Sequence, residues 1–184
     1  MGLYSIVDSR ADNSLFLVSN DFQDFSSVIS RSYNKVELNC SKTGLNELYT
    51  TYKIINKWMG RVYIFKIYGT INHPYTEDIW VSLKYKGNFK SSTPVFFSRK
   101  SNPLLEILNM DKEIINICKA IDLEKLEIKF DCQNNKWSIE IWPNFGDYIW
   151  MLIPPLRYMR RPSQIEVQQT YELMKRLSKM INKL

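Results

Sequence analysis

The sequence is poor in the residues that most often build catalytic and metal centres. Its 184 residues include one histidine, three cysteines and six glycines. The cysteines, Cys40, Cys118 and Cys132, are odd in number and lack CxxC or metal-ligand spacing, so neither a disulfide framework nor a zinc site is predicted. His73 precedes a proline and has no nucleophile beside it, as is typical of a turn residue. No glycine-rich phosphate-binding motif is present, so we expect no cofactor, no metal ion and no catalytic residue.

The sequence also lacks a long apolar run. The longest, Tyr148–Leu156, contains two prolines and is much shorter than the roughly 20 residues that a membrane-spanning helix needs. Near the start, Asp8, Arg10 and Asp12 interrupt the stretch that would have to be apolar in a secretion signal. We therefore expect an intracellular protein, cytoplasmic or nuclear, that is neither secreted nor anchored in a membrane.

Apolar residues and positive charge are, by contrast, plentiful. Hydrophobic residues form 45% of the chain and aromatic residues 14%, which is enough for a sizeable core. The net charge is +6. Residues 1–60 contain six basic and six acidic side chains, so the surplus lies in residues 61–184.

Eight basic residues in this second part form two clusters, and no acidic residue interrupts either cluster. They are Lys84, Lys86, Lys90, Arg99 and Lys100, then Arg157, Arg160 and Arg161. Lysine and arginine beside aromatic rings are typical of proteins that bind single-stranded nucleic acid. Lysines on the solvent side of a strand also protect sheet edges from aggregation, which is the more ordinary explanation. We take the eight residues as candidates for binding a polyanion or a partner.

The first third of the chain is predicted to contain two helical segments. Residues 1–43 are interpreted as an N-terminal extension that packs on the core, with a strand at 15–18 and a short helix capped by Asp21. Over residues 44–59, apolar side chains recur at helical spacing and Gly60 follows them, which predicts a helix.

A pattern of three strands followed by a helix then occurs twice. Strands are predicted at 61–71, 79–85 and 94–97, and again at 126–130, 137–142 and 148–153. The first helix begins at Asn102-Pro103 and is capped again at Asp111, while the second begins with a capping box of Ser163 and Glu166. Pro154-Pro155 is expected to end the sheet. The predicted class is α+β, with antiparallel sheets packed on helices in two units, 44–122 and 123–184.

One passage resembles the ubiquitin-conjugating-enzyme-like superfamily. It comprises Tyr68–Tyr75, Trp80–Tyr85, Phe89 and Thr93–Phe96, where a Gly-x-Ile strand, a Pro-Tyr turn and two further strands occur at similar spacing, and the helix predicted before it fits the same order. The chain enters a helix where catalytic members reach their active cysteine, so Cys118 is not assigned that role. This order is similar to RWD domains, the non-catalytic relatives, and to the paired RWD modules of kinetochore subunits. The resemblance implies a scaffold that presents its surfaces to other proteins.

We interpret the chain as a non-enzymatic protein–protein interaction or scaffold module whose partner is another protein subunit. The alternative is a nucleic-acid-binding protein that uses the basic patches at 84–100 and 157–161. An enzyme with converging carboxylates, such as Glu77 and Asp78, is a third possibility, and no membrane partner is expected. An interaction module should have an exposed apolar edge or groove, a nucleic-acid binder a continuous positive face, and an enzyme a deep polar pocket.

Overall fold

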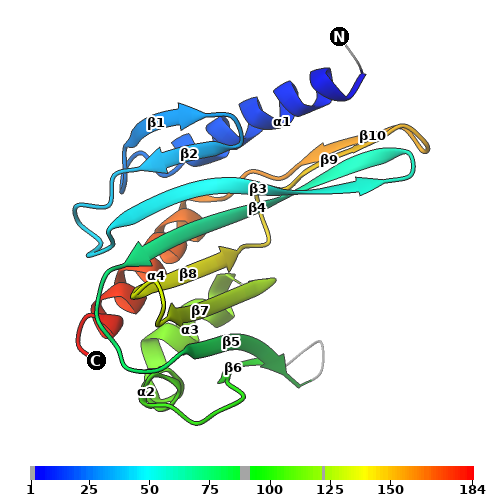
Figure 1. The fold of residues 1–184 in the computed structure, drawn as a ribbon. Helices are drawn as coiled ribbons and strands as arrows, with labels where there is room; N and C mark the ends of the chain where they lie inside the picture. The colour runs from blue at the N-terminus through cyan, green and yellow to red at the C-terminus, as the bar shows by residue number, and fades with distance from the viewer. Residues whose placement is uncertain (1–2, 88–91, 122) are drawn as a thin grey trace.

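The computed structural model describes residues 3–87, 92–121 and 123–184. Within these residues the chain forms one ten-stranded antiparallel sheet and four helices (Figure 1). The elements are α1 Leu3–Asn20, β1 Val28–Ser32, β2 Lys35–Leu38, β3 Glu47–Lys57, β4 Gly60–Ile71, β5 Ile79–Lys86, β6 Thr93–Phe97, α2 Pro103–Met110, α3 Lys112–Ile121, β7 Lys125–Asp131, β8 Lys136–Trp142, β9 Tyr148–Met151, β10 Leu156–Met159 and α4 Gln164–Ile181.

The order of strands in the sheet differs from their order in the chain. The main sheet runs β1-β2-β3-β4-β8-β7-β5-β6. The β7–β8 hairpin therefore lies between β4 and β5, where β8 pairs with β4 and β7 pairs with β5. Strands that are distant in sequence thus complete one continuous sheet.

Strand β4 is long enough to have two different neighbours along the same edge. Its second half, residues 67–71, pairs with β8, whereas its first half, residues 60–63, pairs with β9. Strand β10 then pairs with β9. The β3–β4 and β9–β10 hairpins consequently form a four-stranded extension, which we call the arm (residues 54–63 and 148–159), and Figure 1 shows it projecting past the rest of the sheet.

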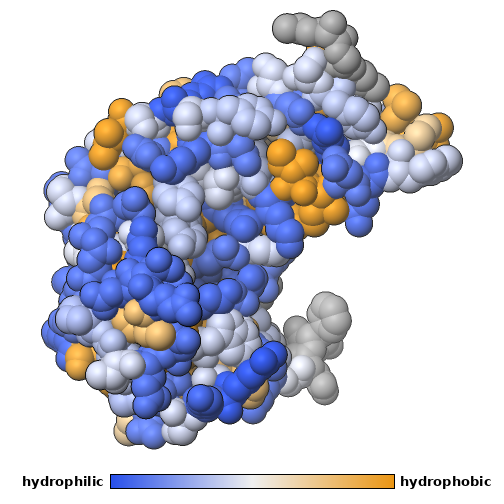
Figure 2. Space-filling model, in the orientation of Figure 1, coloured by the Kyte–Doolittle hydropathy of each residue, from blue (hydrophilic) through white to orange (hydrophobic). Residues whose placement is uncertain are grey.

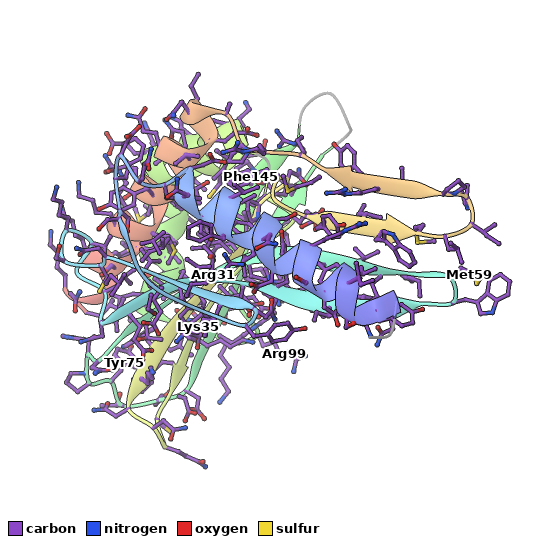
Figure 3. All side chains as sticks on the ribbon, turned by 90° about the horizontal axis from the view of Figure 1, so that it is seen from above. Arg31, Lys35, Met59, Tyr75, Arg99 and Phe145 are labelled. Carbon is purple, nitrogen blue, oxygen red and sulfur yellow. The ribbon has the colours of Figure 1, made fainter. Side chains whose placement is uncertain are left out.

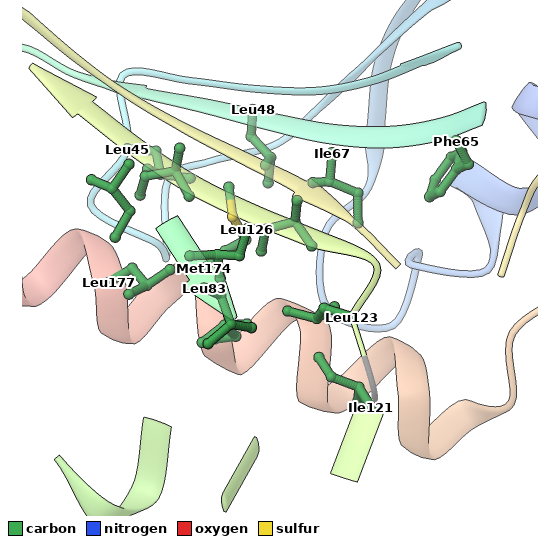
Figure 4. Close-up of a cluster of buried hydrophobic side chains, with 14 of the residues drawn as sticks. Leu45, Leu48, Phe65, Ile67, Leu83, Ile121, Leu123, Leu126, Met174 and Leu177 are labelled. Atoms are coloured by element: carbon green, nitrogen blue, oxygen red, sulfur yellow. The ribbon is translucent and has the colours of Figure 1, made fainter. Parts of the chain in front are cut away.

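The core lies on one face of the sheet. Strand β5 illustrates the pattern, because Val81 and Leu83 are buried while Lys84 is exposed on the opposite face. Figure 4 shows buried side chains of the strands, such as Leu48 and Leu126, meeting Met174 of α4. The other face of the sheet carries the alternating polar and aromatic side chains, and this face provides one of the two surfaces described below.

The predicted class of antiparallel sheets packed on helices in two β-β-β-α units is wrong. Strands dominate the structure, and helices are not the main packing partners of the sheet, since most neighbours of each strand are other strands. The two expected units also do not form separate sheets, because the β7–β8 hairpin of the second is inserted between β4 and β5 of the first.

The helix predicted over residues 44–59 is the strand β3. Its buried positions, Leu48, Thr50 and Tyr52, alternate with more exposed ones, and β-branched and aromatic residues favour this conformation. Gly60 does not end a helix but opens β4. A Cβ atom at this position would lie 2.3 Å from the carbonyl oxygen of Trp150, so the close approach of β4 and β9 requires glycine.

Three further predictions need correction. The strand expected at 15–18 belongs to α1, whose buried residues Val7, Ala11, Leu15 and Val18 lie three or four positions apart and so share one face. The helix that Asp21 was expected to cap is absent among the described residues, which instead form turns and then β1. Pro154-Pro155 does not end the sheet, because the chain returns after it as β10.

The elements with strong local signals are confirmed. The other predicted strands of both units are present, with β9 ending two residues earlier than expected. The side chain of Asn102 accepts a hydrogen bond from the backbone of Leu105 and Pro103 opens α2. Ser163 and Glu166 form the predicted capping box of α4. The two helix-start signals depend on residues within one turn of the chain.

Candidate interaction surfaces

The arm has one face against α1 and one face open to solvent. Arg61 and Tyr63 of β4 point toward α1, where Asp8 accepts a hydrogen bond from each of them. Burial raises the pKa of Asp8, but these two hydrogen bonds and the charge of Arg61 outweigh it, and the net effect is a lowered pKa. The register places Val62 opposite Ile149 on the other face, which is therefore apolar.

The two hairpin tips of the arm are apolar and adjacent. Trp58 at the β3–β4 tip is 90% exposed, and Ile153 at the β9–β10 tip is 62% exposed. The backbone amide of Leu152 donates a hydrogen bond to the carbonyl oxygen of Met59, with an N–O distance of 2.8 Å. This bond holds the two tips side by side, and Figure 3 shows Met59 at the free end of the arm.

Exposed apolar side chains are concentrated at this end. Half of the large hydrophobic side chains that are exposed among the described residues belong to the arm or to the first two turns of α1 beside it, namely Tyr4, Ile6, Trp58, Leu152, Ile153, Leu156 and Tyr158. The ring of Tyr4 contacts Trp150 of β9, with 6.3 Å between centroids. Figure 2 shows hydrophobic side chains gathered over the arm on a surface that is otherwise mostly hydrophilic. Scattered apolar residues are ordinary, whereas a contiguous patch marks a contact surface.

The charge around this patch is positive. No aspartate or glutamate occurs in residues 48–76 or 148–165. Lys57 and Arg157 are exposed on the arm and Lys53 is exposed directly before it on β3, and these three cations form no ion pair with other described residues. The arm end is thus an apolar patch with a basic border, and no acidic side chain of the arm itself compensates that charge.

A second surface lies on the uncovered face of the sheet near β5 and β6. We call it the basic platform, and it consists of Trp80, Lys84, Phe97, Arg99, Lys100 and Lys129. The rings of Trp80 and Phe97 meet edge to face, with 6.1 Å between centroids. The ammonium group of Lys84 lies 4.0 Å from the centre of the Phe97 ring, and the guanidinium of Arg99 lies 5.8 Å from that of Trp80. These are cation–π distances.

An open pocket of about 750 Å³ adjoins the platform. Trp80, Arg99, Lys100 and Lys129 line it, together with polar groups of the loop before α2 and the turn at residues 75–78. Two acidic residues, Glu77 and Asp78, also lie on its wall. The carboxylate of Asp78 accepts a hydrogen bond from the backbone of Cys132 at 2.9 Å, and this bond lowers the pKa of Asp78.

The structure brings together only the first of the two predicted basic clusters. Lys84, Arg99 and Lys100 belong to the platform, with Lys86 exposed at the end of β5 beside them. Lys90 lies outside the described residues.

The second cluster is divided. Arg157 lies on β10 of the arm, at the opposite end of the molecule from β5 and β6 (Figure 1). Arg160 forms an ion pair with Glu166 at 2.8 Å and donates to the carbonyl of Asn144, and Arg161 forms an ion pair with Asp21. A face that joins both patches is therefore not formed.

A family model described as "Protein of unknown function (DUF3156)" matches residues 20–181, which is most of the chain. The chain belongs to the DUF3156 family. Searches of curated proteins and of solved structures gave no match. The DUF3156 match includes both surfaces but not the greater part of α1. The resemblance to RWD domains stays a prediction, and the helix at 44–59 that its element order included is a strand.

The other two candidate residues of the DUF3156 chain are His73, whose backbone contacts Trp137, and Cys118, which is buried. The carbonyl of His73 accepts a hydrogen bond from the Trp137 indole at 2.9 Å. Burial raises the pKa of the Cys118 thiol to about 12, so this cysteine stays protonated. In the described part of the chain, no group of three or more histidine, cysteine, aspartate or glutamate side chains is placed to hold a metal ion. No described helix has the length and apolar character needed to span a bilayer.

Sequence reasoning missed one cluster on the uncovered face. The ammonium groups of Lys53, Lys66 and Lys125 all lie within 5.2 Å of the centre of the Trp142 ring. Two of the three, Lys66 and Lys125, also pair with Glu140. The lysines come from three different strands, so no sequence interval could have indicated this cluster.

Proposed function

We propose that this DUF3156 protein is a non-enzymatic protein-binding module that docks a partner on the end of its arm. The observation that carries the proposal is the concentration of exposed apolar side chains on two adjacent hairpin tips, with Trp58 almost fully exposed. Aromatic side chains contribute much of the binding energy at protein interfaces when a partner buries them. An exposed apolar edge is also what an interaction module requires.

The charge of the arm specifies the chemistry of the partner. Lys53, Lys57 and Arg157 border the apolar patch without acidic residues of the arm between them. We therefore expect an apolar docking surface rimmed by aspartate or glutamate, because complementary charge guides association. Two copies of this chain would place these cations against each other, so a different protein fits better than a second copy.

Strand β10 offers a further means of contact. It pairs with β9 and has no strand on its other side in the described part of the chain. A partner strand could add to this edge and at the same time cover the apolar face of the arm. An intracellular location also belongs to the proposal, and it is supported by three cysteines without disulfides, of which Cys132 is exposed.

Site-specific photo-crosslinking in the native cell tests this proposal. A photoreactive amino acid is placed at Trp58, at Ile153 and, as a control, at Met110, which is an 81% exposed apolar residue on α2. We expect one recurring protein adduct from both arm positions and none from the control position. The double substitution Trp58→Asp, Ile153→Asp should abolish the adduct at a neighbouring arm position, whereas Met110→Asp should not. All of these side chains are exposed, so the variants should keep the fold.

Three results would refute the proposal. One is an equal set of adducts from the arm and control positions. Another is strong flotation of the protein with phosphatidylcholine–phosphatidylserine vesicles that depends on Trp58 and Ile153, because apolar tips with a basic border also suit an anionic lipid surface. Light scattering after size exclusion tests self-association, and the third result is a dimer broken by the same double substitution, which would identify a second copy as the occupant instead.

A further inference from the structure

We infer that the basic platform is a binding site for single-stranded nucleic acid. The platform lies at the opposite end of the molecule from the arm (Figure 1), and the inference does not depend on the proposed function. Three kinds of observation carry it: the aromatic rings, the cations that form no ion pair and the pocket beside them.

The rings provide a surface on which a base can stack. Trp80 of β5 and Phe97 of β6 are neighbours on the uncovered face, and no described helix covers this face of β5 and β6. Trp80 also lines the open pocket, with Arg99 beside its ring. Base–aromatic stacking contributes roughly 1–3 kcal/mol per base and tolerates any sequence, because every base has a π face.

The cations provide contacts for phosphate. Lys84, Arg99 and Lys100 form no ion pair with any described acidic residue. Lys129, which is paired with Trp80 across the two strands, is partly neutralised by Glu127 at 2.7 Å. Lys84, Arg99 and Lys100 can thus contact the phosphates of a strand that crosses β5 and β6. The charge of Lys100 also acts on Asp78 of the pocket wall, whose pKa it lowers.

The pocket favours a single strand over a duplex. Its volume of about 750 Å³ lies within the range of about 300 to 1,000 Å³ that ligand pockets span. A base reaches Trp80 only if it is not paired and stacked within a helix, and the bases of single strands are accessible in this way. An acidic peptide would satisfy the cations but would leave the aromatic rings without a stacking partner.

Fluorescence anisotropy with four defined ligands tests the inference. The ligands are a labelled strand of twelve thymidines, an abasic strand of equal length, a duplex of equal length and polyglutamate as a competitor. We expect the thymidine strand to bind at least about fivefold more tightly than the abasic strand, which corresponds to one stacked base. The logarithm of its affinity should fall with the logarithm of salt concentration with a slope of about −2, from three phosphate contacts.

Matched variants assign the binding to the platform. Trp80→Ala should remove the preference for thymidine over the abasic strand, and Trp80→Phe should restore it. The triple substitution Lys84→Gln, Arg99→Gln, Lys100→Gln should bring the salt slope close to zero. The control, Lys53→Gln, Lys57→Gln, Arg157→Gln on and directly beside the arm, changes the net charge by the same amount and should leave binding intact.

Three outcomes would overturn the inference. The first is equal affinity for the abasic and thymidine strands, which would exclude stacking. The second is an equal loss of binding in the arm control, which would show attraction to net charge alone. The third is displacement of the thymidine strand by polyglutamate when the carboxylate concentration equals the phosphate concentration, which would point to an acidic peptide. None of these results bears on the partner of the arm, so the two proposals fail separately.

Discussion

Replacing Asn109 should destabilise the protein more than any other exposed asparagine on its helices. Asn109 lies near the end of α2, and its side chain binds both backbone groups of one residue of the edge strand β6. The amide of Phe96 donates to Oδ1 of Asn109 at 2.9 Å, and Nδ2 donates to the carbonyl of Phe96 at 3.0 Å. The side chain thereby takes the place of a neighbouring strand.

The magnitude follows from these two hydrogen bonds. Each contributes about 1 kcal/mol net, and the loss is larger where a buried group is left without a partner. Phe96 is buried, so Asn109→Ala should cost about 2.5 kcal/mol in the hydrogen bonds. The better helix propensity of alanine returns about 0.5 kcal/mol. The expected decrease in the free energy of unfolding is therefore about 2 kcal/mol.

Asn116 provides a matched control. It is exposed on α3, and its side chain makes no hydrogen bond with the described residues, so Asn116→Ala should stabilise the protein by about 0.5 kcal/mol. Asn109→Asp keeps the acceptor for Phe96 but loses the donors, and it should lie between wild type and Asn109→Ala. Urea denaturation followed by far-ultraviolet circular dichroism measures all three. If Asn109→Ala proves as stable as Asn116→Ala, the side chain does not hold the edge of β6 and the reasoning is wrong.

Three further predictions concern single residues. Burial raises the pKa of Asp147 to about 6, although its carboxylate accepts a hydrogen bond from the backbone of Phe65. Because this pKa lies above the unfolded value of about 3.9, the free energy of unfolding should fall as pH rises from about 4 to 6. After allowance for partial exposure, Asp147→Asn should raise the free energy of unfolding by about 1 kcal/mol at pH 7 but not at pH 4. Gly60→Ala should lower the unfolding free energy by at least about 2 kcal/mol because the new methyl group would meet the Trp150 carbonyl, and an unchanged melting temperature would contradict the close approach of β4 and β9. Ellman's reagent should react with exposed Cys132 in the native protein and with buried Cys118 only after unfolding, and Asp78→Asn should speed the first reaction because the hydrogen bond to Asp78 raises the pKa of Cys132.

Local signals in the sequence identified local structure. The caps at Asn102, Asp111 and Ser163 act within three residues of themselves, so the helices that follow them could be predicted. Tyr52 shows the limit of such signals, because it fits both a helical and an alternating pattern with its neighbours in residues 44–59. The many β-branched residues there favoured a strand, but a pairing partner decides between the two, and that partner lies elsewhere in the chain.

The same distinction between local contacts and contacts with distant parts of the chain applies to the candidate sites. Lys84, Arg99 and Lys100 meet because one hairpin and the loop after it carry them, so their cluster was visible in the sequence. The separation of Arg161 from them was not, since its partner Asp21 is 140 residues distant. The arm was also hidden, because Pro154-Pro155 indicates the end of a sheet and not the tip of a hairpin whose return strand is β10.

The insertion of the β7–β8 hairpin between β4 and β5 also imposes an order on synthesis. While the ribosome has released only residues up to about 124, β4 and β5 exist without the two strands that join them, and each exposes an edge able to pair with another nascent chain. The sheet becomes continuous only when Trp142 has emerged, which makes this a non-local and slow closure. A protein truncated within residues 125–142 would keep two such edges open permanently, so premature termination there should give aggregates instead of a smaller folded domain.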